Sequence, residues 1–260
     1  MVANPKKVDG AAVTSRFADI SFESFRRRAR DASLSPNEKI GYPEEFRAGL
    51  TPTILADIEA KMPAFAMTGK AVLDIGIGCG ELAQEVIRLA GERNHRLVGV
   101  DSPEMLELLP EAGGFTKVAG RFPDVAAEAR AVAPDGFDAI LVYGVVQCVF
   151  VDGNVFRFID EALALLAPGG RMMVGDLANF SKLRRFLASE AGAAYHRDYM
   201  RTDEAPDVPP FAAPGDRMDD ATILALVNRA RAAGYDAWVV PQPEALPMSN
   251  RREDLVFARP

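Results

Sequence analysis

The sequence contains few of the residues that mark several common protein classes. Its 260 residues include two cysteines and two histidines, and acidic residues outnumber basic ones by 37 to 30. Two thiols alone form neither a zinc site nor a disulfide framework, so we predict that Cys79 and Cys148 are reduced. The net charge of −7 argues against a general nucleic-acid-binding surface, because such a surface needs an excess of positive charge.

Long apolar segments are also lacking. The longest apolar run, residues 139–151, is interrupted by Gly144 and Gln147 and is too short to cross a bilayer. Residues 1–15 are polar and have no periodicity, which predicts a disordered tail and no signal peptide. We therefore expect a cytoplasmic protein that has no membrane partner.

The strongest motif lies at residues 70–81, Lys-Ala-Val-Leu-Asp-Ile-Gly-Ile-Gly-Cys-Gly-Glu. An apolar run ending in Asp74, three closely spaced glycines and a helix-forming run from Leu82 predict a strand, a tight turn and a helix. Because glycine has no Cβ atom, a ligand can approach the backbone, and the following helix directs its free N–H groups at that ligand. A merely structural turn would not need three glycines, which cost backbone entropy.

The spacing of these glycines distinguishes two classes of ligand. A dinucleotide-binding turn has the spacing G-x-G-x-x-G, but here Gly76, Gly78 and Gly80 alternate and Glu81 takes the position of the third glycine. A carboxylate at that position would repel a pyrophosphate. The pattern acid-x-G-x-G-x-G instead resembles motif I of the class I S-adenosylmethionine (SAM)-dependent methyltransferases, whose loop holds the amino-acid end of a cationic sulfonium cofactor.

Two further features support the same resemblance. A second buried strand, residues 96–101, ends in Asp101, whose two carboxylate oxygens can accept both ribose hydroxyls. Asp101 and Ser102 also read as the start of a helix at Pro103, which is compatible with that role. The sequence Leu-Ala-Pro-Gly-Gly at residues 166–170, before another apolar strand, resembles the family signature in this region.

The resemblance covers about residues 65–260 and implies an α/β fold. This fold is a doubly wound, mostly parallel seven-stranded sheet with a reversed last strand and helices on both faces. The alternation of strand and helix patterns along the chain favours the same sheet.

Two segments outside the predicted sheet are expected to cover the site. Residues 16–64 are predicted to form an N-terminal helical cap, with a helix over residues 44–61. Within it, Tyr42 and Phe46 are assigned to core packing, with a cofactor contact as the alternative. Residues 177–218 form a long insert after the fifth strand, and loops of this length inside a compact domain are more often lids than spacers.

The resemblance also implies where the cofactor is held. The family commonly packs an apolar side chain, here Met105, against adenine. After the third strand the family often has Gly-Asp, whereas this chain has Gly120-Arg121, so groups near Arg121, the Phe122 ring or, as a weaker candidate, Asp124 would have to recognise adenine. The predicted cofactor-binding residues are Asp74, Gly76, Gly78, Gly80, Asp101, Ser102, Met105, Gly120, Arg121, Phe122, Tyr143, Gly144 and Val145.

The predicted substrate site lies at the insert and at the C-terminal basic pair. Gln147 follows the fourth strand, Tyr195 lies in the insert, and Arg251 and Arg252 precede the last strand. Clustered arginine and lysine favour an anionic substrate, because the guanidinium fork fits phosphate or carboxylate. A solvated basic surface is the equal alternative.

Methyl transfer from a sulfonium is an in-line displacement, so aligning the acceptor with the methyl group supplies much of the catalysis. An oxygen or nitrogen acceptor must still lose a proton. We prefer His196 in the insert as general base, because imidazole titrates near neutral pH, with Asp176 at the tip of the fifth strand as the alternative. His95 is expected at the surface. No carboxylate cluster of a metal-dependent enzyme is evident, so we predict no metal.

Residues 33–50 and 246–255 also look like bacterial methyltransferases associated with surface-polysaccharide biosynthesis, which implies a phosphorylated or sugar-derived acceptor. The predicted function is therefore methyl transfer from SAM to oxygen or nitrogen of a small anionic molecule, with S-adenosylhomocysteine (SAH) as product. An NAD-type oxidoreductase and a SAM-binding protein without catalysis are the alternatives. A homodimer is left open.

Overall fold

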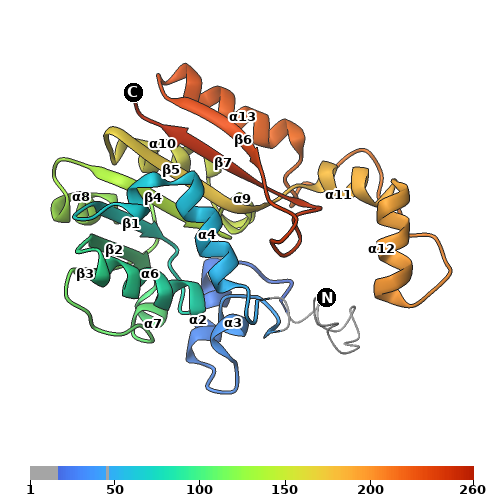
Figure 1. The fold of residues 1–260 in the computed structure, drawn as a ribbon, viewed down its shortest axis with the longest axis horizontal. Helices are drawn as coiled ribbons and strands as arrows, with labels where there is room; N and C mark the ends of the chain where they lie inside the picture. Colours follow the sequence, from blue (N-terminus) through green and yellow to red (C-terminus); the bar gives the residue numbers. More distant parts are fainter. Residues whose placement is uncertain (1–16, 45–46) are drawn as a thin grey trace.

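The computed structural model describes residues 17–44 and 47–260, so the predicted disordered tail and Phe46 lie outside the described residues. In the described part of the chain, seven strands form one sheet in the order β3-β2-β1-β4-β5-β7-β6 (Figure 1). The strands are β1 (Ala71–Ile75), β2 (Arg96–Asp101), β3 (Phe115–Ala119), β4 (Phe137–Tyr143), β5 (Leu166–Ala178), β6 (Asp236–Pro241) and β7 (Arg252–Ala258).

The direction of the strands confirms the predicted fold class. Strands β1 to β5 are parallel to one another, and β7 runs antiparallel to both β5 and β6. The chain builds outward from β1 to β3 and then returns to place β4 on the other side of β1. Ligands of open α/β sheets bind at the carboxyl edge of such a switch point.

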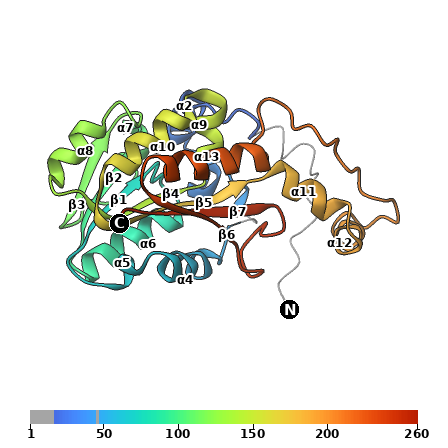
Figure 2. The same cartoon turned by 90° about the horizontal axis from the view of Figure 1, so that it is seen from above.

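Helices cover both faces of the sheet (Figure 2). On each strand, alternate residues belong to different cores, as Leu73 and Ile75 pack on one face of β1 and Val72 on the other. Burial on both faces explains why the strands read as continuous apolar runs. One layer contains α4 (Thr51–Lys61), α5 (Pro63–Ala66) and α6 (Glu81–Glu92), and the other contains α8 (Ala126–Val132), α10 (Val155–Ala164) and α13 (Asp220–Ala232).

The start of the predicted helix over residues 44–61 is wrong. Helix α4 begins at Thr51, and residues 47–50 form a turn. Pro52 explains the boundary, because proline has no backbone N–H and its ring clashes with the preceding turn, so it is tolerated only in the first turn of a helix. Ile54 and Ile58 of α4 pack in the same core as α6, so this helix belongs to a sheet-covering layer.

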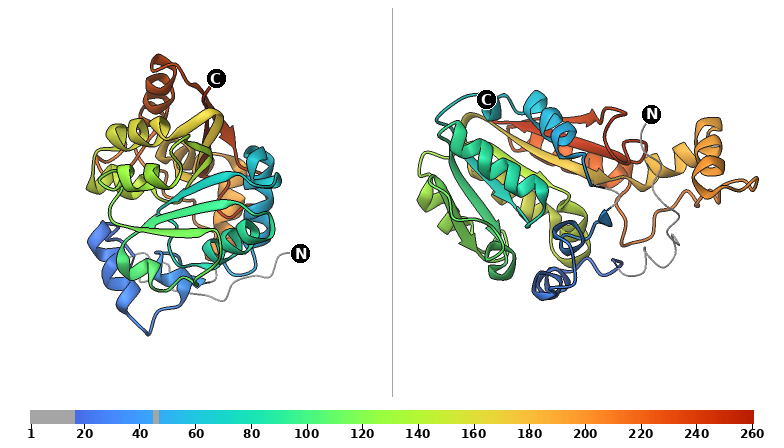
Figure 3. Two further views of the ribbon diagram at one scale, coloured as in Figure 1. Left: turned by 90° about the vertical axis from the view of Figure 1, so that its left-hand side faces the viewer. Right: turned by 60° about the horizontal axis from the view of Figure 1, so that its bottom comes forward.

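The N-terminal helices α2 (Phe22–Arg30) and α3 (Pro36–Lys39) lie away from these layers. Figure 3 shows them in dark blue at one end of the molecule, opposite α13. Arg26 and Arg30 form ion pairs with Glu104 of α7 (Pro103–Leu106), which hold α2 next to the end of β2. The division of the chain at residues 15, 64 and 218 stays a prediction.

The insert after β5 contains two helices, α11 (Phe180–Leu187) and α12 (Glu190–Met200), which project from the sheet (Figure 1). A further helix, α9 (Val146–Asp152), follows β4 directly. Among the described helices, none is long and apolar enough to cross a membrane.

Candidate functional site

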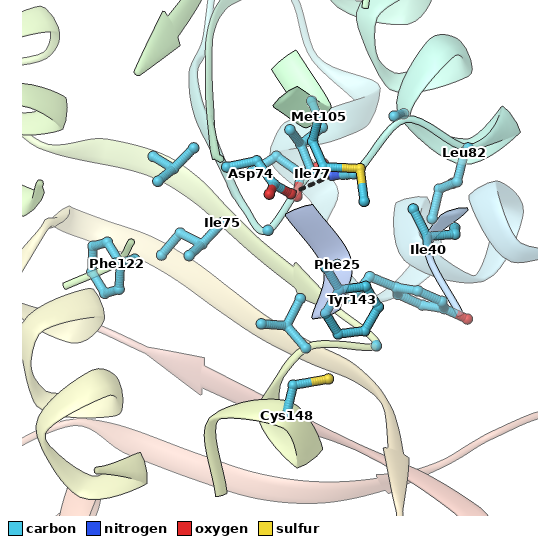
Figure 4. Close-up of a pocket in the computed structure, with 18 of the residues that line it drawn as sticks. Phe25, Ile40, Asp74, Ile75, Ile77, Leu82, Met105, Phe122, Tyr143 and Cys148 are labelled. Carbon is cyan, nitrogen blue, oxygen red and sulfur yellow. Dashed lines mark hydrogen bonds between the residues drawn. The ribbon is translucent and has the colours of Figure 1, made fainter. Parts of the chain in front are cut away.

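A cavity lies at the carboxyl edge of β1, β2 and β4, and residues of the N-terminal segment also line it (Figure 4). In the figure, Phe122 lies at one side of the cavity and Ile40 at the other, with Asp74 and Ile75 between them. The structure brings together nearly all the predicted cofactor residues here. Those that line the cavity are Asp74, Gly76, Gly78, Gly80, Asp101, Met105, Gly120, Arg121, Phe122, Tyr143, Gly144 and Val145.

Ser102 is the predicted cofactor residue that does not line the cavity. Its side chain is buried, and its hydroxyl accepts a hydrogen bond from the backbone N–H of Met105 at 3.3 Å, which caps helix α7. The predicted cofactor contact of Ser102 is therefore not supported, because capping uses the hydroxyl.

The glycine turn between β1 and α6 can be built only from residues without a Cβ atom. Gly76 and Gly78 have φ angles of +74° and +65°, in the left-handed region that other residues rarely adopt. A Cβ atom on Gly78 would lie 2.7 Å from Cγ2 of Ile40, and one on Gly76 would lie 2.5 Å from Cγ2 of Val145. The turn is thus packed between the N-terminal segment and the residues that follow β4.

Two carboxylates lie beside this turn, and they differ in their partners. Asp101 accepts hydrogen bonds from the backbone N–H groups of Gly78 at 2.8 Å and of Ser102 at 2.7 Å. Asp74 is 4% exposed, and among the described residues it makes no side-chain hydrogen bond. Burial raises the pKa of Asp101 to about 6, and burial followed by the nearby Asp101 charge raises the pKa of Asp74 to about 8. A bound cation would relieve this burial cost.

One wall of the cavity, which we call the roof, is formed by N-terminal residues, most of which have no predicted role in the site. Phe22 and Phe25 of α2, Ile40 and Arg47 all line it, together with Tyr42. The spacing of the two phenylalanines on one face of a helix was a usable signal. Nothing local in the sequence connects Ile40 to the glycine turn, because that contact exists only in the folded chain.

Asp176 at the end of β5 anchors this roof. Its Oδ2 atom accepts hydrogen bonds from the Tyr42 hydroxyl at 2.8 Å and from Nη2 of Arg47 at 2.7 Å. Arg252 donates to the backbone oxygen of Asp176 at 2.7 Å, and its Nη1 lies 3.6 Å from Oδ2. Asp176 is 1% exposed, and Tyr42 and Arg47 stand between it and the cavity wall. Arg252 is therefore a structural partner of Asp176.

A second buried acid continues this cluster. Asp254 of β7 accepts hydrogen bonds from the backbone N–H of Asp176 and from Gln242, both at 2.9 Å. Lys61 Nζ lies 2.6 Å from Asp254 and 2.6 Å from Asp57. The three acids balance Lys61 and the two arginines that contact Asp176, so the cluster as a whole carries no net charge.

None of the six predicted substrate and catalytic residues lines the cavity, and three of them lie in or beside the insert. His196 and Tyr195 are on the projecting helix α12, where Tyr195 stacks on Tyr199 with ring centroids 5.7 Å apart. Arg251 lies beside Tyr195. The structure therefore does not bring His196 to the site, because the helices of the insert extend outward instead of folding over the sheet.

Gln147 makes a contact within its own segment of the chain. Its side-chain amide donates to the backbone oxygen of Gly144 at 2.8 Å, which closes the first turn after β4, and it does not line the cavity. Tyr143 and Cys148 do line it. Burial raises the pKa of Tyr143 well above its usual value and that of Cys148 to about 12, so both keep their protons near neutral pH.

Three basic residues in helix α11 of the insert are held by partners within the protein. Lys182 donates to the backbone oxygen of Arg252 at 2.7 Å, and Arg184 donates to that of Pro209 at 3.1 Å. Arg185 forms an ion pair with Asp220. These contacts weaken the prediction that the insert binds an anion.

Two other observations concern histidine and metal. His95 is buried, with Nδ1 accepting from the backbone N–H of Lys70 at 3.1 Å, so the expected surface position is wrong. Within residues 17–44 and 47–260, no group of three or more His, Cys, Asp or Glu side chains is arranged to hold a metal ion.

Comparison with known protein families finds a match to the segment of the chain that contains the glycine turn. Residues 72–170 match the methyltransferase domain family. No curated protein sequence matches the chain significantly. The matched segment contains the glycine turn, the ends of β2 and β4, and the Pro-Gly-Gly sequence in the first part of β5.

Solved structures share the fold at low sequence identity. The plantazolicin methyltransferase BpumL, in complex with a triazolic desmethylPZN analog and SAH, superposes with a TM-score of 0.56 at 10% identity over 96% of this chain and 98% of that chain. The N-methyltransferase NodS from Bradyrhizobium japonicum WM9, in complex with SAH, has a TM-score of 0.53 at 14% identity over 93% and 100%. An O-methyltransferase family protein from Burkholderia thailandensis has a TM-score of 0.51 at 15% identity over 96% and 68%.

At these identities the likeness to solved structures shows the fold. Together with the domain match, it supports an enzyme of the methyltransferase class whose cofactor is SAM. The matched segment offers this cofactor a glycine turn and two carboxylates, of which Asp74 is buried and makes no side-chain hydrogen bond among the described residues.

Proposed function

We propose that the protein transfers the methyl group of SAM to an oxygen or nitrogen atom of a small anionic acceptor. The observation that carries this proposal is the unpartnered, buried Asp74 carboxylate beside the glycine turn, with its pKa raised to about 8. A buried carboxyl without a partner is costly, and a cationic ligand offsets that cost. A pyrophosphate would add negative charge to the same place.

The cofactor-binding roles follow from the positions along the carboxyl edge. The backbone N–H of Gly80, at the start of α6, would hold the carboxylate of the amino-acid end. Asp101, already oriented by two backbone N–H groups, would accept the ribose hydroxyls. Tyr143, Gly144 and Val145 at the end of β4 would border the methyl group.

Asp176 acting through Tyr42 is the proton acceptor that we propose. The Tyr42 hydroxyl donates to Asp176 at 2.8 Å, and Tyr42 lines the cavity. The acceptor molecule would give its proton to the Tyr42 oxygen as the tyrosine proton passes to Asp176. After product release the proton would return from Asp176 through Tyr42 to water in the cavity, which regenerates both groups. His196 stays a prediction without support from its position on α12.

The anionic character of the acceptor is supported by Arg47. Its guanidinium lines the cavity and stacks on the Tyr42 ring at 3.9 Å, and its Nε is buried without a hydrogen-bond partner among the described residues. A carboxylate or phosphate at the cavity could accept from it. The association with surface-polysaccharide biosynthesis, and hence a phosphorylated or sugar-derived acceptor, stays a prediction.

Calorimetric titration with SAM, SAH and NAD tests the proposal. We expect tight binding of SAH, binding of SAM, and no binding of NAD, with Asp101→Ala weakening SAH. Tritiated SAM is then incubated with a panel of amine, hydroxyl, carboxylate and phosphate compounds. Binding of NAD, or of no nucleotide, would contradict the proposal, and SAH binding without label transfer to any compound would favour a SAM-binding protein without catalysis.

A further inference from the structure

The resemblance to class I methyltransferases implies an acid directly after Gly120 that would accept from the adenine amino group, but this chain has Arg121 at that position. We infer that Arg121 and Asp152 together select adenine as the base of the cofactor. This inference rests on the proposed function, because it assumes that the cavity binds SAM. It assigns the acceptor of the base's amino group to helix α9 instead of the loop after β3.

The sheet order determines where the base lies. The glycine turn follows β1 and the ribose-binding Asp101 ends β2, so a nucleoside that extends past its ribose reaches the end of β3. This side of the cavity is lined by Met105, Arg121 and Phe122. Figure 4 shows Phe122 at the side opposite Ile40. Asp152, the last residue of α9, lines the same cavity and lies beside Arg121.

The two side chains are paired loosely and have free hydrogen-bonding groups. Arg121 Nη2 lies 3.4 Å from Asp152 Oδ2, and the two side chains are 40% and 35% exposed. Asp152 Oδ2 accepts from the backbone N–H of Phe22 at 2.9 Å. Among the described residues, Asp152 Oδ1 accepts no hydrogen bond and the Arg121 guanidinium donates none.

The chemistry of the pair complements one edge of adenine. Adenine presents an amino donor next to a ring-nitrogen acceptor. A carboxylate has acceptors only and a guanidinium has donors only. Asp152 can therefore accept from the amino group while Arg121 donates to the ring nitrogen. A hypoxanthine base, with an oxygen in place of the amino group and a proton on that ring nitrogen, would meet two mismatches.

A neighbouring ion pair provides a matched control. Asp124 and Arg157 also lie 3.4 Å apart, with side chains 63% and 58% exposed. They lie in the adjoining surface depression and do not line the cofactor cavity. A substitution in this pair changes the net charge by the same amount, without contact with the cavity that would hold the base.

The test compares binding of SAH and S-inosylhomocysteine by calorimetry in the full chain. Wild-type protein is expected to bind SAH at least about tenfold more tightly, since a good bidentate base contact discriminates by about 1–3 kcal/mol. Asp152→Asn keeps an oxygen for the Phe22 N–H, and we expect it to weaken SAH about tenfold while S-inosylhomocysteine is unaffected or improved. Asp124→Asn should leave both affinities unchanged.

Each outcome bears on the inference. Equal weakening of both ligands in Asp152→Asn would overturn it, because that pattern reports loss of the contact with Phe22 and not base recognition, and an unchanged ratio in a folded variant would overturn it too. If Asp152→Asn does not fold, Arg121→Leu replaces it and must lower SAH affinity more than S-inosylhomocysteine affinity. Wild-type protein that binds neither nucleoside would instead overturn the proposed function.

Discussion

The N-terminal segment and the insert after β5 are both predicted to cover the site, and the structure uses them differently. Tyr42 and Arg47 of the N-terminal segment line the cavity and contact Asp176, which is 1% exposed. The insert's Arg184 and Arg185 are held by Pro209 and Asp220, and α12 projects from the body. Basic residues in a sequence therefore do not by themselves indicate an anion site.

The ion pairs of the two regions also differ in burial, and therefore in their expected contribution to the free energy of unfolding. A buried charge destabilises the folded state unless a partner of opposite charge compensates for the lost hydration. An exposed charge is solvated with or without a partner. Variants of the N-terminal segment should therefore have large effects on stability and catalysis. Equivalent variants of the insert should have small ones.

Replacing Arg47 should have the largest effect. Arg47→Ala removes the nearer of the two guanidinium groups that contact the buried Asp176, at 2.7 Å, and leaves Arg252 at 3.6 Å, so we expect a loss of about 3 kcal/mol in the free energy of unfolding. Arg197→Ala on the exposed surface of α12 should change it by less than about 0.5 kcal/mol. Urea unfolding measures both, and losses below about 1 kcal/mol in both variants would remove the contrast.

Tyr42→Phe tests the proposed proton path. Removing the hydroxyl breaks the link between Asp176 and the cavity, so methyl transfer should slow by about 10²-fold. SAH affinity should stay within about twofold, because the cofactor contacts lie elsewhere along the edge. The rate is followed with tritiated SAM and the acceptor found in the panel. An unchanged rate would exclude this path.

Asp74 should make stability depend on pH. Its pKa is about 8 in the folded protein and about 4 in an unfolded chain, so between these values the folded state holds a proton that the unfolded state has lost. Stability therefore falls as pH rises, by about 2 kcal/mol from pH 6 to pH 8. Asp74→Asn should remove this loss, and Asp203→Asn in the exposed insert should not. Thermal unfolding over pH 5–9 decides, and parallel curves for all three proteins would contradict the expectation.

Gly78→Ala should weaken cofactor binding by at least about tenfold. A side chain at φ +65° costs about 1–2 kcal/mol, and its Cβ atom would lie 2.7 Å from Ile40. Gly215 in the insert has no atom within 4 Å of such a Cβ, so Gly215→Ala is the control. SAH titration compares them, and equal affinities would show that the turn adapts.

The smallest effect is expected for His196→Ala. The side chain lies on α12 and does not line the cavity, so SAH affinity and the unfolding free energy should change by less than about 0.5 kcal/mol. The methyl-transfer rate should also stay within about twofold of the wild-type rate. A rate loss as large as that of Tyr42→Phe would restore His196 as the general base.

Local sequence was sufficient to predict which residues along the carboxyl edge line the cavity. The apolar runs of β1 and β2 end in Asp74 and Asp101, and the carboxyl ends of parallel neighbouring strands meet at one edge, so both acids were predictable. The glycines were predictable because their backbone conformation depends on the residue itself. Ser102 was the exception, since helix capping and ligand binding call for the same residue type.

The side chains at the part of the cavity where we propose that the acceptor binds could be identified only from the folded structure. Tyr42 and Asp176 are 134 residues apart, and Arg252 reaches Asp176 because β7 pairs antiparallel with β5. Whether a charged residue is buried with a partner or solvated depends on such distant contacts, which no local pattern contains. The order of the strands, the glycine turn and the positions of Asp74 and Asp101 could be predicted from sequence, because they follow from strand periodicity and from the conformational freedom of glycine. The packing of N-terminal residues over the cavity and the outward direction of the insert depend on contacts that form only in the folded chain.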